Sequence, residues 1–153
     1  MRIAASREVA APAERVWEVV TDIEGSATVL SAVDAVERLD DGVGFEVGTR
    51  WRETRTMLGR QATEEMEVTA VDAPRSYTVV AGDAATTYTS TITVEPRGAE
   101  GCLLSMTFAG SSSGLVARVL AATVGRAFAG ATRRALEQDL DDLAARAEAG
   151  SAA

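Results

Sequence analysis

The last third of the chain carries the longest helical periodicity and constrains what the remainder can form. Between residues 113 and 147, large apolar side chains recur mostly at steps of three or four, and Thr132 fills one longer gap. This spacing is typical of an amphipathic helix with one apolar stripe, which Ser113 is suited to cap and Gly150 to end. The stripe consists of Val116, Leu120, Val124, Phe128, Leu136, Leu140 and Leu143.

A helix of some thirty residues is roughly 45 Å long and needs a surface of matching length to bury its stripe. The preceding segments alternate in polarity with period two, most clearly at residues 86–95. We therefore predict strands at residues 2–9, 33–40, 48–57, 62–71, 75–81, 86–95 and 102–109. Pro12 indicates a short helix that ends near Asp22, and a further helical turn is expected at residues 25–30.

This order of elements predicts an α+β fold. A seven-stranded antiparallel sheet would wrap around the long C-terminal helix, with two short helices after the first strand. One domain is expected over residues 1–147, followed by a flexible tail at 148–153. Because sheet and helix need not touch along their whole length, we expect a cavity between them.

Composition excludes several classes of function. The chain has 153 residues and a net charge of −8, which argues against nucleic acid or an anionic membrane as a partner. It contains no histidine, so the commonest general base and most zinc sites are ruled out, and no metal or cofactor is expected.

Cys102 is the single cysteine, and no signal peptide is recognised, which favours the cytoplasm. The apolar run at residues 115–132 contains two arginines and is expected to be a core helix rather than a membrane span.

Three segments and the order of elements carry a resemblance to a known family. They are Val9-Ala10-Ala11-Pro12-Ala13-Glu14-Arg15-Val16-Trp17, Gly48-Thr49-Arg50-Trp51, and Val68-Thr69-Ala70-Val71-Asp72-Ala73-Pro74-Arg75. With the last strand and the long helix, they resemble the START-like, birch-pollen-allergen-like superfamily (SRPBCC), and within it the polyketide cyclase/dehydrase family. The resemblance implies a helix-grip fold with an internal apolar cavity. It does not decide function, because members bind lipids, hormones or polyketides and only some are enzymes.

The strand at residues 48–57 holds the candidate catalytic residues. If Trp51 points into the cavity, Glu53, Arg55 and Met57 point there too; the opposite register remains possible, but a tryptophan is costly to expose. Glu53 and Arg55 would then either form a structural ion pair or act on a ligand. In the second case Arg55 would orient a carbonyl or enolate oxygen while Glu53 moves a proton.

The other expectations concern the lining of the cavity and the acidic clusters. Glu64, Glu65 and Glu67 are expected at an acidic strand edge, and Asp139, Asp141 and Asp142 on a solvated helix surface. Phe45, in a glycine-rich loop, is a candidate to shield the cavity mouth. The predicted ligand-binding residues are Trp51, Met66, Tyr77, Tyr88, Ser90, Met106, Phe108, Val124 and Phe128.

Three functions are compatible with these residues. The favoured one is binding of a small hydrophobic or aromatic, lipid- or polyketide-like ligand by a monomer or homodimer. The second is a polyketide cyclase or aromatase acting in the same cavity, so whether the chain is an enzyme stays open. The third is a partner-binding domain whose cavity is nearly filled. A cavity of roughly 300 Å³ or more would favour the first two.

Overall fold

The computed structural model describes residues 2–57, 59–82, 86–112 and 115–151. Within these ranges the side chains of residues 86, 111–112, 115–126, 128 and 151 are not described. The elements follow in the order β1 (Arg2–Val9), α1 (Ala13–Thr21), α2 (Ser26–Val29), β2 (Val33–Arg38), β3 (Arg50–Met57), β4 (Arg60–Asp72), β5 (Ser76–Gly82), β6 (Thr86–Pro96), β7 (Cys102–Ser112) and α3 (Leu115–Ser151).

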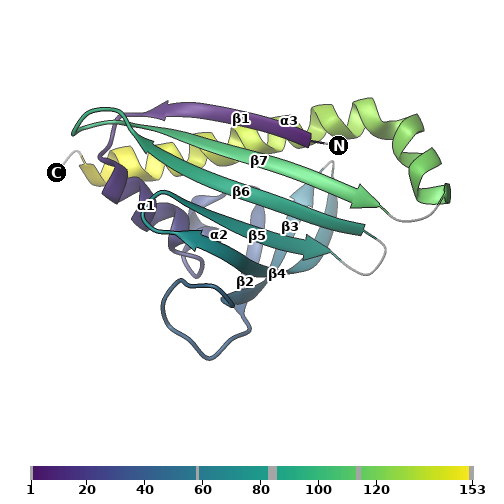
Figure 1. The fold of residues 1–153 in the computed structure, drawn as a ribbon, viewed down its shortest axis with the longest axis horizontal. Helices are drawn as coiled ribbons and strands as arrows, with labels where there is room; N and C mark the ends of the chain where they lie inside the picture. The colour runs from purple at the N-terminus through teal and green to yellow at the C-terminus, as the bar shows by residue number, and fades with distance from the viewer. Residues whose placement is uncertain (1, 58, 83–85, 113–114, 152–153) are drawn as a thin grey trace.

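The strands form one antiparallel sheet in the order β1-β7-β6-β5-β4-β3-β2. Strands β2 to β7 follow one another as a meander, and β1 adds to the far edge beside β7. The long helix α3 runs along the sheet, while α1 and α2 bridge the ends of β1 and β2 (Figure 1). The predicted helix-grip architecture with seven antiparallel strands is confirmed.

Helix α3 is longer than the sequence indicated. It spans 37 residues and continues to Ser151, so Glu148 to Ser151 are helical rather than part of a flexible tail. Gly150 therefore does not end the helix. The predicted cap, Ser113, lies outside the described residues, as do the side chains of the first half of the stripe.

The second half of the stripe is buried as predicted. Leu136, Leu140 and Leu143 are all at most 7% exposed, and Thr132 is 6% exposed. Polar ties to β1 hold the same helix in register: the Arg133 guanidinium donates to the carbonyl oxygen of Ala4 at 3.0 Å. Further ties are Arg7 to Asp141 at 3.0 Å and the Ala10 amide to Glu148 at 2.9 Å.

The solid part of the core lies beneath the C-terminal turns of α3. Leu140, Ala144 and Ala147 are at most 1% exposed and belong to one cluster with Val16 of α1 and Leu104 of β7. Just before this cluster, the residues of α3 from Thr132 to Asp139 line a cavity against the sheet. The cavity thus begins where the packed core ends, and residues 132–143 are shared between the two.

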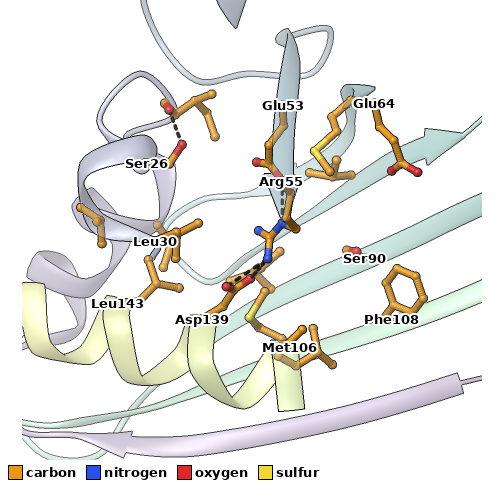
Figure 2. Close-up of a pocket in the computed structure, with 18 of the residues that line it drawn as sticks. Ser26, Leu30, Glu53, Arg55, Glu64, Ser90, Met106, Phe108, Asp139 and Leu143 are labelled. Carbon is orange, nitrogen blue, oxygen red and sulfur yellow. Dashed lines mark hydrogen bonds and ion pairs between the residues drawn. The ribbon is translucent and has the colours of Figure 1, made fainter. Parts of the chain in front are cut away.

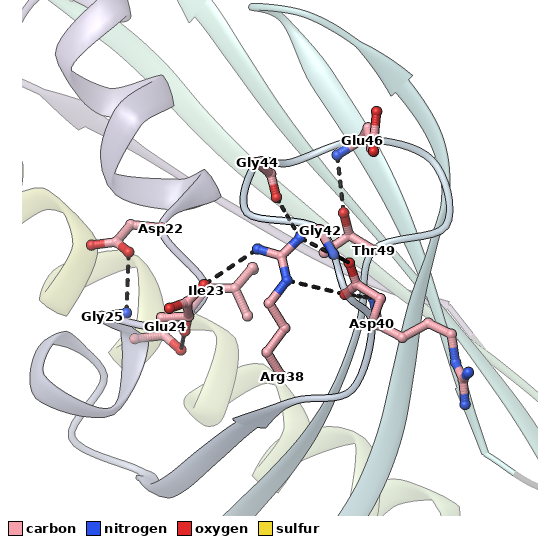
Figure 3. Close-up of polar contacts among 12 residues, drawn as sticks. Asp22, Ile23, Glu24, Gly25, Arg38, Asp40, Gly42, Gly44, Glu46 and Thr49 are labelled. Atoms are coloured by element: carbon pink, nitrogen blue, oxygen red, sulfur yellow. Dashed lines mark hydrogen bonds and ion pairs between the residues drawn. The ribbon is translucent and has the colours of Figure 1, made fainter.

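The glycine-rich loop between β2 and β3 is held by one arginine. Arg38 donates to Asp40 at 3.0 and 3.1 Å, to the carbonyl oxygen of Gly44 at 2.6 Å and to Glu24 at 3.3 Å (Figure 3). The hydrogen bonds from Arg38 keep the pKa of Asp40 well below its usual range. This network gives the loop a defined conformation.

Phe45 lies in this loop and packs inward. Its ring is 4.7 Å from that of Tyr77 and 6.4 Å from that of Trp17, both in edge-to-face arrangements. Phe45 therefore supports the wall behind Tyr77 and does not itself line the cavity. Separately, none of the helices in the described part of the chain has the length and hydropathy needed to cross a bilayer.

Candidate functional site

A cavity of about 310 Å³ lies between the concave face of the sheet, the two short helices and α3. Its walls are mostly apolar, with side chains such as Val20, Leu30, Trp51, Met66, Met106 and Leu136. The volume falls within the range of small-molecule sites, and an apolar wall with a few polar groups is their usual composition. The cavity is therefore not the nearly filled one that the third hypothesis required.

A buried cluster of three charged side chains crosses this cavity. Arg55 on β3 donates from Nη1 to both carboxylate oxygens of Asp139 on α3, at 3.0 and 3.1 Å. Its Nε donates to Oε2 of Glu53, at 3.3 Å. Figure 2 shows Arg55 reaching from the strand towards the helix, with Asp139 at its tip and Glu53 behind it. The cluster therefore joins sheet and helix through the cavity.

The cluster contains two carboxyl groups but one guanidinium group. The side chains of Glu53 and Asp139 are 8% and 6% exposed, and one guanidinium serves both carboxyl groups. Burial, opposed by Arg55 and assisted by the nearby charge of Glu53, raises the pKa of Asp139 to about 6. Burial acts to lower the pKa of Arg55, but Asp139 and Glu53 outweigh it and raise that pKa above its usual value. Asp139 can therefore gain or lose a proton near neutral pH, while Arg55 stays charged.

The structure places β3 in the register that the sequence favoured. Trp51, Glu53, Arg55 and Met57 all line the cavity. Arg52, on the opposite face, pairs instead with Glu37 and Glu65 on neighbouring strands, each at 3.0 Å. Glu53 and Arg55 form the ion pair that the structural interpretation expected, but the second partner of Arg55, Asp139, was not anticipated.

Seven of the nine predicted ligand-binding residues line the cavity. They are Trp51, Met66, Tyr77, Tyr88, Ser90, Met106 and Phe108. The side chains of the other two, Val124 and Phe128, lie outside the described part of the chain. The Tyr77 hydroxyl donates to the carbonyl oxygen of Val20 at 3.0 Å, so it holds α1 against the sheet. Tyr88 stacks on Phe108 with ring centroids 5.3 Å apart, which forms an aromatic wall.

Two predictions about acidic residues were wrong. Asp139 is 4% exposed and faces the cavity, whereas a solvated surface had been expected. Asp142, from the same predicted surface, accepts two hydrogen bonds from Ser31 at 2.8 and 2.9 Å and fastens the segment after α2. Glu64 lines the cavity rather than a strand edge, whereas Glu65 and Glu67 pair with Arg50 on the outer face of the sheet. Both misplaced residues occupy inward positions. Glu64 lies opposite inward-facing Glu53 in the register of β3 and β4, and Asp139 lies three residues after the buried Leu136.

Thr132 is a further polar group of the site that was taken only as part of the apolar stripe. It lines the cavity, and its buried hydroxyl has no hydrogen-bond partner among the residues that the structure describes. An unsatisfied buried hydroxyl is costly unless a ligand or water meets it. Among the described residues, no three acidic, Cys or His side chains are placed to hold a metal ion.

The sheet wrapped around a terminal helix, with a cavity between them, defines the class of START-like helix-grip proteins. Three of the solved structures that share this architecture illustrate the similarity. A protein from Thermus thermophilus is 21% identical, with a TM-score of 0.82 and 99% of both chains covered. The Zhui aromatase/cyclase from a Streptomyces species is 20% identical, with a TM-score of 0.79 over 97% of this chain and 93% of that one. A START superfamily protein from Mycobacterium smegmatis is 17% identical, with a TM-score of 0.64 over 90% of this chain and 97% of the other.

The sequence itself identifies the family. Residues 1–148 match the model of the family described as polyketide cyclase / dehydrase and lipid transport, and the chain belongs to that family. None of the curated proteins matches the sequence. The resemblance inferred from the sequence motifs is thereby confirmed at the level of family.

Proposed function

We propose that this protein binds a small hydrophobic or aromatic ligand in the cavity between the sheet and α3. The observation that carries the proposal is the cavity itself, with a volume of about 310 Å³ and predominantly apolar walls. Burial of apolar ligand surface provides the main driving force for binding at such a site. The aromatic wall of Tyr88 and Phe108 offers a flat surface for a ring.

Binding is tested by titrating the protein with a neutral fluorescent dye, N-phenylnaphthylamine. Saturable enhancement of its fluorescence is expected. Ala135→Phe places a ring in the cavity and should abolish this enhancement, because Ala135 is part of the lining. Ala145→Phe makes the same change at an exposed position of α3 and should leave it unchanged. No saturable binding by the unaltered protein, or equal loss in both variants, would contradict the proposal.

A second candidate function is a polyketide cyclase or aromatase acting in the same cavity. It is favoured by the buried Glu53, Arg55 and Asp139 cluster, since a carboxyl group that titrates near pH 6 is suited to proton transfer. Arg55 would position a carbonyl oxygen with Nη2, which makes no hydrogen bond to the described residues. Its positive charge is already offset by two carboxylates, however, which weakens it as a stabiliser of an enolate. For this reason we favour binding over catalysis.

The two functions are separated by a product assay on a poly-β-keto substrate alongside the dye titration. An enzyme should form a cyclised product, and Glu53→Gln should lower turnover while dye affinity stays nearly unchanged. Saturable dye binding without product from the unaltered protein would rule out cyclisation of that substrate and leave the binding function.

A further inference from the structure

Thr132 on α3 is a buried polar residue whose hydroxyl group is not used within the fold. Its exposed fraction is 6%, and it lines the cavity. Among the residues that the structure describes, no group forms a hydrogen bond with its Oγ1. A hydroxyl that leaves water without gaining a hydrogen bond destabilises the folded protein, so an unpaired one inside a cavity requires an explanation.

A threonine within a helix has an acceptor close at hand. Its hydroxyl can donate to the carbonyl oxygen four residues earlier in the same helix. Thr21 of α1 does so, and its Oγ1 lies 2.8 Å from the carbonyl oxygen of Trp17. Thr132 makes no such bond in the described part of the chain. Its hydroxyl therefore stays available to the cavity, both as a donor and as an acceptor.

The rotation of α3 that directs Thr132 into the cavity is fixed on both sides of it. The next residue, Arg133, donates to the carbonyl oxygen of Ala4 on β1 at 3.0 Å. Nearly two helical turns further on, and so on the same face as Thr132, Asp139 is bound by Arg55 of β3 at 3.0 Å. Thr132 cannot turn away from the cavity unless these two ties to the sheet are broken.

We propose that Thr132 is a specificity-determining residue of the cavity, and that its hydroxyl forms a hydrogen bond with a hydroxyl or carbonyl oxygen on an otherwise apolar ligand. The inference rests on the proposed binding function and narrows its ligand class to molecules that carry such an oxygen. The apolar body of the ligand would contact Leu136 and Met106 and lie against the wall of Tyr88 and Phe108. The ligand thus supplies the hydrogen bond that the fold does not.

Two pairs of naphthalene derivatives test this assignment. They are 1-naphthol with 1-methylnaphthalene and 2-naphthol with 2-methylnaphthalene, and each pair compares a hydroxyl with a methyl group of similar size. Every compound is used to displace N-phenylnaphthylamine, which gives the ratio of dissociation constants within each pair. Thr132→Val replaces the hydroxyl of the protein with a methyl group. It should shift the ratio against the naphthol by about three- to tenfold in at least one pair, the value of one hydrogen bond.

Two further variants show whether the hydroxyl itself is responsible. Thr132→Ser restores the hydroxyl and should restore the preference that valine removes. Thr107→Val makes the same change of atoms on the outer face of β7, because Thr107 lies between Met106 and Phe108, which both line the cavity. This variant should leave both ratios unchanged.

Thermal unfolding without ligand provides an independent readout. Thr132→Val removes a buried hydroxyl that has no partner in the fold, so the variant should have a melting temperature about 2–6 °C higher than the unaltered protein. A protein that becomes more stable while it loses the preference for naphthol has the behaviour expected of a ligand-binding hydroxyl. A lower melting temperature would mean that the hydroxyl is bonded within the protein, and the inference would fail.

The outcomes separate the inference from the function on which it rests. If the dye binds saturably but Thr132→Val leaves both ratios unchanged, the inference is wrong and the cavity remains a binding site. The same conclusion follows if Thr107→Val shifts the ratios as much as Thr132→Val does. If the dye itself does not bind, the proposed function fails as well.

Discussion

Replacing Asp139 with asparagine should remove a destabilisation of the folded protein that grows as the pH rises. In the folded protein the pKa of Asp139 is raised from its ordinary 3.8 to about 6, chiefly by burial. Below pH 3.8 the carboxyl is protonated in both the folded and the unfolded chain, and the cost is absent. As the pH rises towards 6, the unfolded chain releases the proton first, so the free energy of unfolding decreases.

The size of the effect follows from the shift. One pKa unit corresponds to about 1.4 kcal/mol, so a shift of about two units lowers the free energy of unfolding by roughly 3 kcal/mol at neutral pH. Asparagine does not titrate, and it keeps one oxygen for the Nη1 group of Arg55. The difference in unfolding free energy, variant minus unaltered protein, should therefore rise by roughly 2–2.5 kcal/mol between pH 4 and pH 7, because a small part of the cost is already present at pH 4. A constant offset from the lost charge does not alter this slope.

Urea unfolding followed by circular dichroism at several pH values measures this slope. Asp141→Asn is the matched control, since Asp141 has a side-chain exposure of 62% and an exposed partner in Arg7. Its difference curve should change by less than about 1 kcal/mol over the same range. The sign of the result for Asp139→Asn is informative. A difference that falls with pH would mean that the ion pair with Arg55 outweighs burial, and a flat one that the two cancel; either result would refute our account of the cluster.

Three further predictions concern the packing of Leu140 in the core, the hydroxyl of Tyr77 and the guanidinium of Arg55. Leu140→Ala should lower the free energy of unfolding by about 2–5 kcal/mol, because Leu140 is 1% exposed. Asp141→Ala should change it by less than about 1 kcal/mol. Equal effects of the two variants in urea unfolding would mean that the buried face of α3 has been assigned to the wrong residues. Tyr77→Phe removes the buried hydrogen bond to Val20 and should cost about 1–3 kcal/mol in the same assay, while dye affinity stays within about threefold; a large loss of affinity would assign the hydroxyl to the ligand instead. Arg55→Lys should destabilise the protein although the charge is kept, because lysine cannot bind Asp139 and Glu53 with a planar fork; thermal stability equal to that of the unaltered protein would argue against this bridging role.

The fold was predictable because two periodicities in the chain leave few alternatives. Period two at residues 86–95 and 102–109 gives half-buried strands, and the stripe from Thr132 to Leu143 gives a helix with one buried face. The sheet and the helix each need the other to bury their apolar faces. The end of α3 was misplaced because an alanine-rich segment has high helix propensity but little apolar contrast, and the Ala10–Glu148 hydrogen bond that fastens it joins residues far apart in sequence.

The site was only partly predictable, since its lining follows from strand register but its charge does not. Once Trp51 is taken as buried, the alternation along β3 places Glu53 and Arg55 in the cavity. The partner of Arg55 comes from α3, and no local pattern reveals a pairing across 84 positions of sequence. Long-range pairings of this kind depend on how the sheet curves around the helix, which side-chain periodicity does not determine.

Asp139 nevertheless left a signal in the helical spacing. It lies three residues after Leu136 and four before Leu143, which places it on the same face as these two buried leucines. A carboxylate at such a position is costly unless a partner reaches it, because a buried charge requires compensation. Its residue type suggested a solvated surface, whereas its phase indicated the interior. Where the residue type and the position in the helical repeat disagree on a helix that covers a cavity, the position determines where the side chain lies. The residue type then determines its chemistry there. By the same reasoning, Thr132 on this face is a buried polar group that lines the cavity and not merely a gap in an apolar stripe.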